Sequence, residues 1–92
     1  MTLWLDDIRE APEGCIDVCS VNQAIHKILE YWDQIDCLDL DHDLGDYAKD
    51  GGDAINLLDW CVENQFFPKV KLHTSNPVGR ANMERLIARH WP

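Results

Sequence analysis

The sequence predicts an α/β fold with a small, mostly parallel sheet of about four strands and three helices. Short apolar runs alternate with segments whose apolar residues recur at helical spacing. Strands that alternate with helices pair in parallel, because each helix returns the chain to the start of the next strand. The 92 residues are expected to form one domain, residues 1–92, with a single core.

The first two strands are expected close to the N-terminus. The apolar run 3–5 stops at two aspartates, and residues 15–19 form a second candidate strand after a turn. The intervening residues 6–14 hardly suffice for a crossover helix. Either a bare loop crosses the sheet or the second strand pairs antiparallel, and we favour the bare loop.

The first helix is expected to begin after Ser20. This serine is a suitable N-cap, and Gln23 three residues later completes a capping box. The apolar residues at helical spacing are Val21, Ala24, Ile25, Ile28, Leu29 and Trp32.

The third strand is expected at residues 37–40, and a polar loop follows over residues 45–52. Asp53 is a suitable cap for a second helix that runs to about Asn64. The apolar face of that helix consists of Ala54, Leu57, Leu58 and Cys61.

The fourth strand, residues 70–72, leads into a polar segment over residues 73–76. Asn76 followed by Pro77 is a standard helix start, because asparagine caps the first turn and proline fits its first position. The core side of this last helix carries Met83, Leu86 and Ile87.

Composition favours a folded, cytoplasmic protein. Apolar residues make up 46% of the chain, and no apolar run has the length of a signal peptide or a membrane span. The cysteines lack the paired spacing of a structural zinc site, so we expect buried free thiols, with a disulfide pair left open. These cysteines are Cys15, Cys19, Cys37 and Cys61.

Charge is distributed unevenly along the chain. The net charge is −9, and eight aspartates fall within residues 33–53. Residues 69–89 hold five basic residues and one acid. Because phosphate backbones attract basic surfaces, this balance argues against simple electrostatic binding of nucleic acid.

The densest chemical pattern is LDLDHDLG at residues 38–45. It places Asp39, Asp41, His42 and Asp43 within five positions. Like charges repel, and a buried carboxylate without a partner is costly. A hard divalent cation such as Mg²⁺ would relieve the repulsion, so the pattern suggests a metal-assisted site that acts on phosphate.

Polar groups follow three of the four expected strands. They are the pair at residues 6–7, the cluster at 41–43 and the segment at 73–76. In open α/β sheets, ligands bind beyond the carboxyl ends of the strands, and right-handed connections bring these three groups to one edge.

Each group also has a purely structural interpretation. The alternatives are a turn for residues 6–7 and 43–45, a core histidine for His73 and an N-cap for Asn76. Arg80 opposes the dipole of the last helix, so it is either a surface arginine or a ligand of bound phosphate.

The acidic pair, Asp41 and the Thr74-Ser75 pair resemble the receiver domain of two-component signalling. The resemblance implies that the carboxylates hold Mg²⁺ and that Asp41 accepts a phosphoryl group. A receiver also has a fifth strand followed by a lysine, and a helix between its first two strands. The pattern contains neither, and Lys71 lies inside the fourth expected strand.

Three motifs give a closer resemblance: LWLDDIR at residues 3–9, LDHDLG at 40–45 and HTSNPVGRANM at 73–83. They are similar to the cyclic-phosphate-processing receiver-like family, whose members are short receiver derivatives. The resemblance implies a flavodoxin-like three-layer sandwich with strand order 2-1-3-4 and three helices. The fold that the resemblance implies lacks the fifth strand and the first helix of a receiver.

The first functional hypothesis is a metal-dependent enzyme that processes cyclic or terminal phosphates of nucleotides or RNA ends. Mg²⁺ or Mn²⁺ would neutralise phosphate charge and activate water. The expected metal ligands are Asp6, Asp7, Asp41 and Asp43. The expected catalytic residues are Asp41, His42 and His73, with a histidine as general acid or base. The expected phosphate ligands are Ser75, Asn76 and Arg80, together with amides of the last helix.

Two further hypotheses remain. Asp41 would be the phosphoacceptor of a signalling switch, or the acids would bind a basic partner without catalysis. Clustering of Asp6, Asp41 and His73 around one cleft would disfavour the binding module. The sequence leaves the metal, the substrate and the oligomeric state open, and no membrane contact is expected.

Overall fold

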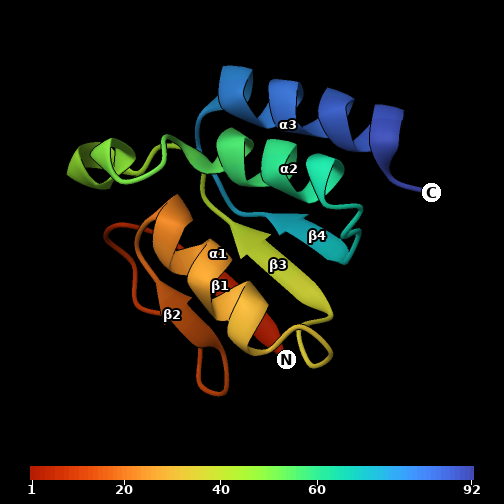
Figure 1. Ribbon diagram of the computed structural model, residues 1–92. Coiled ribbons are helices and arrows are strands. Elements are labelled where there is room, and N and C mark those ends of the chain that lie inside the picture. The colour runs from red at the N-terminus through yellow and green to blue at the C-terminus, as the bar shows by residue number, and fades with distance from the viewer.

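The computed structural model describes all 92 residues and contains one four-stranded parallel sheet (Figure 1). Its strands are β1 (Thr2–Leu5), β2 (Ile16–Val18), β3 (Cys37–Leu40) and β4 (Lys69–Leu72). They pair in the order β2-β1-β3-β4, and every neighbouring pair is parallel. The expected strand order is therefore confirmed, as is the bare loop between the first two strands.

Three α-helices follow the strands. They are α1 (Val21–Glu30), α2 (Ala54–Glu63) and α3 (Pro77–His90). A short 3₁₀ helix, η1 (Gly45–Lys49), occupies most of the segment that we expected to be a plain polar loop. The expected face of α1 extended too far, since the helix ends at Glu30 and Leu29 is 61% exposed. Trp32 lies beyond the helix and packs against Phe66.

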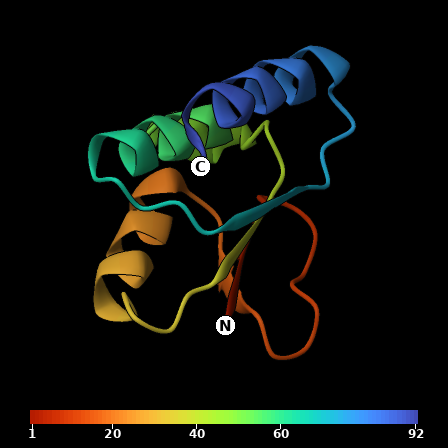
Figure 2. The same cartoon turned by 90° about the vertical axis from the view of Figure 1, so that its right-hand side faces the viewer.

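The helices lie on one face of the sheet, and the β1–β2 connection lies on the other (Figure 2). The expected α/β receiver-like fold is confirmed, and its regular structure forms two layers, the sheet and the helices. In right-handed wiring, a connection that runs from β1 outward to β2 crosses the opposite face from one that runs from β2 back to β3. Residues 6–15 make that crossing without a helix, so no helical layer covers the second face.

The two faces of the sheet differ in polarity. Alternate side chains of each strand point to opposite faces. The helix-facing side supplies fully buried leucines to one core, including Leu3, Leu5, Leu38 and Leu40. On the other face, one register row crosses all four strands and consists of Asp17, Trp4, Asp39 and Lys71.

The helix starts follow the expected residues, with one exception. The hydroxyl of Ser20 accepts from the amide of Gln23 at 3.1 Å and donates to Asp50 at 2.6 Å. Asn76 accepts from two amides of the first turn of α3. Asp53 stands at the cap position of α2, but its carboxylate accepts from the amide of Leu44 instead of capping the helix. This bond fixes the loop after β3 rather than the helix end.

All four cysteines are free thiols. Cys37 and Cys61 are buried as expected, and burial raises the pKa of Cys61 to about 12. Cys15 and Cys19 are only half-buried, because they flank the short edge strand β2. Among the helices, none combines the length and the apolar character that crossing a membrane requires.

Truncation of a core leucine should cost much more stability than truncation of an exposed leucine. We expect Leu38→Ala to lower the free energy of unfolding by about 2–5 kcal/mol, because Leu38 is 0% exposed and its loss leaves a cavity. The matched control is Leu29→Ala, which should change stability by less than about 0.5 kcal/mol. Urea unfolding followed by tryptophan fluorescence measures both values, and equal losses would contradict this account of the core.

Candidate functional site

A pocket of about 310 Å³ opens at the carboxyl ends of the strands. The ladder between β1 and β3 continues past both strands, since the amide of Asp41 donates to the carbonyl of Leu5 at 2.9 Å. This bond brings the residues after β1 beside those after β3. The pocket is lined by Asp6, Asp7, Ile8, Arg9, Asp41, Asp43, Gly45 and Ser75.

Asp6, Asp7 and Asp41 form one carboxylate cluster. Each offers an oxygen atom, and these atoms lie within 4.8 Å of one another. Asp6 is almost fully buried, whereas Asp7 and Asp41 are half-buried and face the pocket. Three like charges at this spacing repel, so the cluster favours a cation among them.

Asp6 is the most tightly held member of the cluster. One of its oxygens accepts from the amides of Ile8 and Arg9 at 2.8 and 2.9 Å, and the other lies 3.0 Å from Nε2 of His73. Burial raises the pKa of the Asp6 carboxyl, but the two amides and His73 together hold it below its ordinary value of 3.8. Asp6 therefore stays ionised at neutral pH, as a metal ligand must.

Asp7 lies directly against the backbone of Gly45. That glycine has φ +56°, and a Cβ placed on it would come within 2.7 Å of Oδ2 of Asp7. The bare backbone of Gly45 thus leaves room for the carboxylate. Asp41 is fixed differently, because one of its oxygens accepts from the amide of His42 at 2.8 Å.

His73 is held on three sides. Its Nδ1 lies 2.7 Å from Oδ1 of Asp39 and its Nε2 lies 3.0 Å from Oδ2 of Asp6. Its ring stacks on Trp4 with centroids 3.9 Å apart and planes 6° from parallel. The ring therefore contacts the carboxylate cluster and is not an isolated core histidine. Neither Trp4 nor Asp39 is among the site residues that the sequence predicts.

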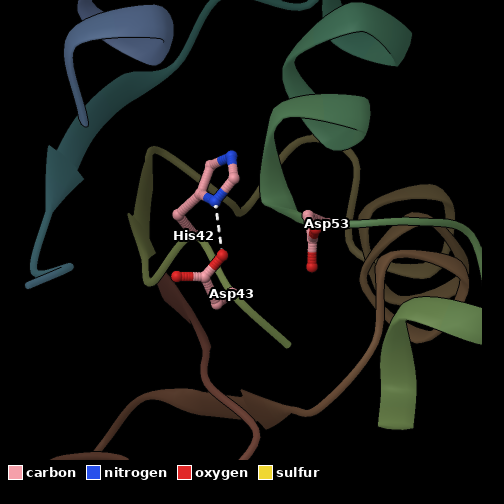
Figure 3. Close-up of side chains that lie close together, drawn as sticks. All are labelled: His42, Asp43 and Asp53. Atoms are coloured by element: carbon pink, nitrogen blue, oxygen red, sulfur yellow. Dashed lines mark hydrogen bonds and ion pairs between the residues drawn. The ribbon is translucent and has the colours of Figure 1, made fainter. Parts of the chain in front are cut away.

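His42 belongs to a second group of side chains beside the pocket (Figure 3). Its Nδ1 lies 3.0 Å from Oδ1 of Asp43, and Asp53 completes a group whose ligand atoms fall within 4.8 Å of one another. The imidazole packs over Gly79, where a Cβ would meet the ring at 2.5 Å. The pKa of the Asp43 carboxyl is lowered, chiefly by the hydrogen bond between Asp43 and His42. Burial acts to raise this pKa, and the hydrogen bond from Asn76 helps to lower it. His42 does not line the carboxylate pocket.

The three expected phosphate ligands are placed differently from one another. Ser75 lines the pocket. Asn76 donates to both oxygens of Asp43 and caps the amides of Val78 and Gly79, so those amides already have a partner. Arg80 donates to the carbonyls at the end of β4 and does not reach the pocket.

Arg9 is a pocket cation that is not among the site residues predicted from the sequence. It lines the pocket, its side chain is about half exposed, and its Nε lies 3.8 Å from Oδ2 of Asp6. The only sequence signal for it was its place at the end of the LWLDDIR motif.

A family model described as the cyclic-phosphate processing receiver domain matches residues 1–89. The chain belongs to this family. Comparisons with curated proteins and with solved structures gave no match. In this receiver domain the family match contains every residue of the carboxylate pocket, because the lining residues fall between positions 6 and 75.

The lowered pKa of Asp6 predicts how stability changes with acid. The unfolded carboxyl binds its proton more readily than the folded one, so the stabilisation that ionised Asp6 provides is present above pH 3.8 and is lost as pH falls toward the folded value. We expect the unfolding free energy of the wild type to fall relative to that of Asp6→Asn over this range. Urea titrations between pH 2.5 and about 6 measure the difference. If the wild type instead became more stable relative to Asp6→Asn as the pH fell, this assignment would be contradicted.

Proposed function

We propose that this receiver domain uses a divalent metal ion, held by Asp6, Asp7 and Asp41, to process cyclic or terminal phosphates of nucleotides or RNA ends. The observation that carries the proposal is the convergence of three carboxylate oxygens within 4.8 Å, beside a histidine that contacts one of them. The family to which the chain belongs is consistent with a phosphate-bearing substrate.

The donor set fits Mg²⁺ or Mn²⁺. Both ions prefer oxygen ligands, and the three donors of the cluster are carboxylates. Asp7 and Asp41 offer the freer oxygens, because both oxygens of Asp6 already accept hydrogen bonds. When bound, the ion would neutralise phosphate charge and lower the pKa of a coordinated water.

Two further pocket residues would bind the phosphate, and His73, which contacts Asp6 beside the pocket, would supply the proton. Arg9 and the hydroxyl of Ser75 line the same pocket and would bind phosphate oxygens. In ring opening, a bond forms between the water oxygen and phosphorus, and the bond from phosphorus to one ribose oxygen breaks. Nε2 of His73 would give its proton to that ribose oxygen, while the proton of the water passes to solvent.

The geometry gives less support to the two other hypotheses. Asp6 and Asp41 line one pocket and His73 contacts Asp6 beside it, instead of the acids spreading over an exposed face, which is unlike a non-catalytic acidic module. A phosphoacceptor switch would use a lysine beside Asp41. Lys71 is exposed, lies in register with Asp39 on the outer face and does not line the pocket.

Opening of a nucleoside 2′,3′-cyclic phosphate tests the proposal directly. Wild-type protein with Mg²⁺ or Mn²⁺ should release nucleoside monophosphate, and Asp41→Asn should reduce the rate by about 100-fold or more, because it removes a charged metal ligand. Asp46→Asn is the matched control, since Asp46 is exposed on η1 and lies outside the pocket. Equal product release by wild type and Asp41→Asn would refute the proposal.

A substitution at Gly45 tests metal affinity without requiring catalysis. Gly45→Ala should weaken Mn²⁺ binding about 10–100-fold, because the new methyl group displaces the carboxylate of Asp7. Gly14→Ala is the control for backbone strain, because Gly14 also has positive φ but no atom lies within 4 Å of its Cβ position. Tryptophan fluorescence reports binding, since Trp4 stacks on the His73 ring that contacts Asp6. Equal Mn²⁺ affinities of the two variants would show that Asp7 is not a ligand of the metal.

A further inference from the structure

A second pocket lies on the face of the sheet that no helix covers. Its volume is about 430 Å³, and it is lined by Thr2, Asp36, Cys37, Lys69 and Lys71. Thr2, Cys37 and Lys69 form one register row at the amino ends of β1, β3 and β4. Lys71 belongs to the next row on this face, so the pocket extends from the amino ends of the strands toward the carboxylate cluster.

The two lysines of this lysine pocket have no partner in the protein. Both are exposed, and neither ammonium group forms an ion pair. The acids beside them already have partners. Asp36 lies 3.2 Å from the amino group of Met1. Asp39, which is in register with Lys71, lies 2.7 Å from Nδ1 of His73. In a chain whose net charge is −9, the lysine pocket thus presents two unpaired positive charges, which suit an anion.

The lysines are spaced like the phosphates of an extended polynucleotide strand. A β-strand rises about 3.3 Å per residue, so Lys69 and Lys71 lie about 7 Å apart along β4. By the same rise and the strand register, the row of Lys71 lies about 7 Å before Asp41, and the row of Lys69 about 13 Å before it. Successive phosphates of a single strand have a similar separation. A chain that ends in the carboxylate pocket would therefore bring its next two phosphates to the two lysines.

We propose that the lysine pocket binds backbone phosphates of a single-stranded RNA whose terminal phosphate lies in the carboxylate pocket. The inference rests on the proposed function and narrows its substrate to RNA ends. Lys71 and Lys69 would each contact one phosphate, and the hydroxyl of Thr2 would donate to the phosphate beside Lys69. Because the net charge of the protein repels a polyanion, the lysines hold only a chain whose end is already anchored at the metal site.

Binding of a short RNA without turnover tests this inference. The probe is a uridine oligonucleotide with a 5′ fluorescein and a 3′-phosphate, which is a product of ring opening, and fluorescence anisotropy is followed with Mg²⁺ present. The double variant Lys69→Gln/Lys71→Gln should weaken binding about 10-fold and reduce the slope of log K against log salt by about 1.4, because each lysine that contacts a single strand contributes about 0.7 to that slope. Both lysines are exposed, so the variant keeps the fold.

The matched control is Lys27→Gln/Lys49→Gln, which removes the same charge from residues that line neither the lysine pocket nor the carboxylate pocket. This control should bind the probe as the wild type does. Equal binding by the two double variants would overturn the inference, as would absence of binding to the wild type. Competition by polyglutamate as strong as that by unlabelled oligonucleotide would also overturn it, because the pocket would then take an acidic polypeptide.

Turnover separates this inference from the proposed function. The two substrates are a mononucleoside 2′,3′-cyclic phosphate and an oligonucleotide with the same cyclic end. Lys69→Gln/Lys71→Gln should lower kcat/KM about 10-fold more for the oligonucleotide than for the mononucleotide, because only the longer substrate reaches the lysines. Equal losses for both substrates would contradict the inference. If the wild type opens neither substrate, the proposed function fails, and the anisotropy titration still decides whether the lysine pocket binds RNA.

Discussion

The parallel pairing of β1 with β3 is the constraint on which the rest of the structure depends. Leu5 is in register with Leu40, and the ladder continues by one bond from the amide of Asp41 to the carbonyl of Leu5. Both strands end at the same height, so the acidic residues that follow them have to share one edge. The cluster of carboxylates is therefore a consequence of register. A slip of β3 by one residue would turn each of its side chains to the opposite face of the sheet and separate the carboxylates.

Repulsion within this cluster is offset by neighbours from distant parts of the chain. Two loop amides and the His73 ring hold Asp6, and the guanidinium of Arg9 lies close to the same carboxylate. Asp7 and Asp41 keep oxygens that face the pocket. The protein thus neutralises the buried charge with its own groups and leaves the exposed charges available to a cation, which is the arrangement that a metal site on a small domain needs.

The face without helices is where the candidate chemistry is organised. A helix between β1 and β2 would cover Trp4 and Asp39 with apolar side chains. The bare connection of residues 6–15 instead leaves room for His73 to lie on Trp4 and to bond Asp39. The same connection supplies Arg9 to the pocket. The face that no helix covers therefore holds the imidazole that contacts the carboxylate cluster.

The family resemblance implied the strand order. The sequence by itself determined the alternation of strands with helices, the helix starts at Ser20 and Asn76, and the meeting of Asp6, Asp7 and Asp41 at one edge. These follow from periodicity, local capping and the wiring rules of parallel sheets, all of which act over short or regular spacings. Only the tertiary structure decided which partner each polar side chain takes. It paired Asp39 with His73, bound Asp53 to the amide of Leu44, turned Arg80 to the end of β4 and placed Arg9 in the pocket. Such choices depend on side-chain reach and desolvation across strands far apart in sequence, and no local pattern encodes them.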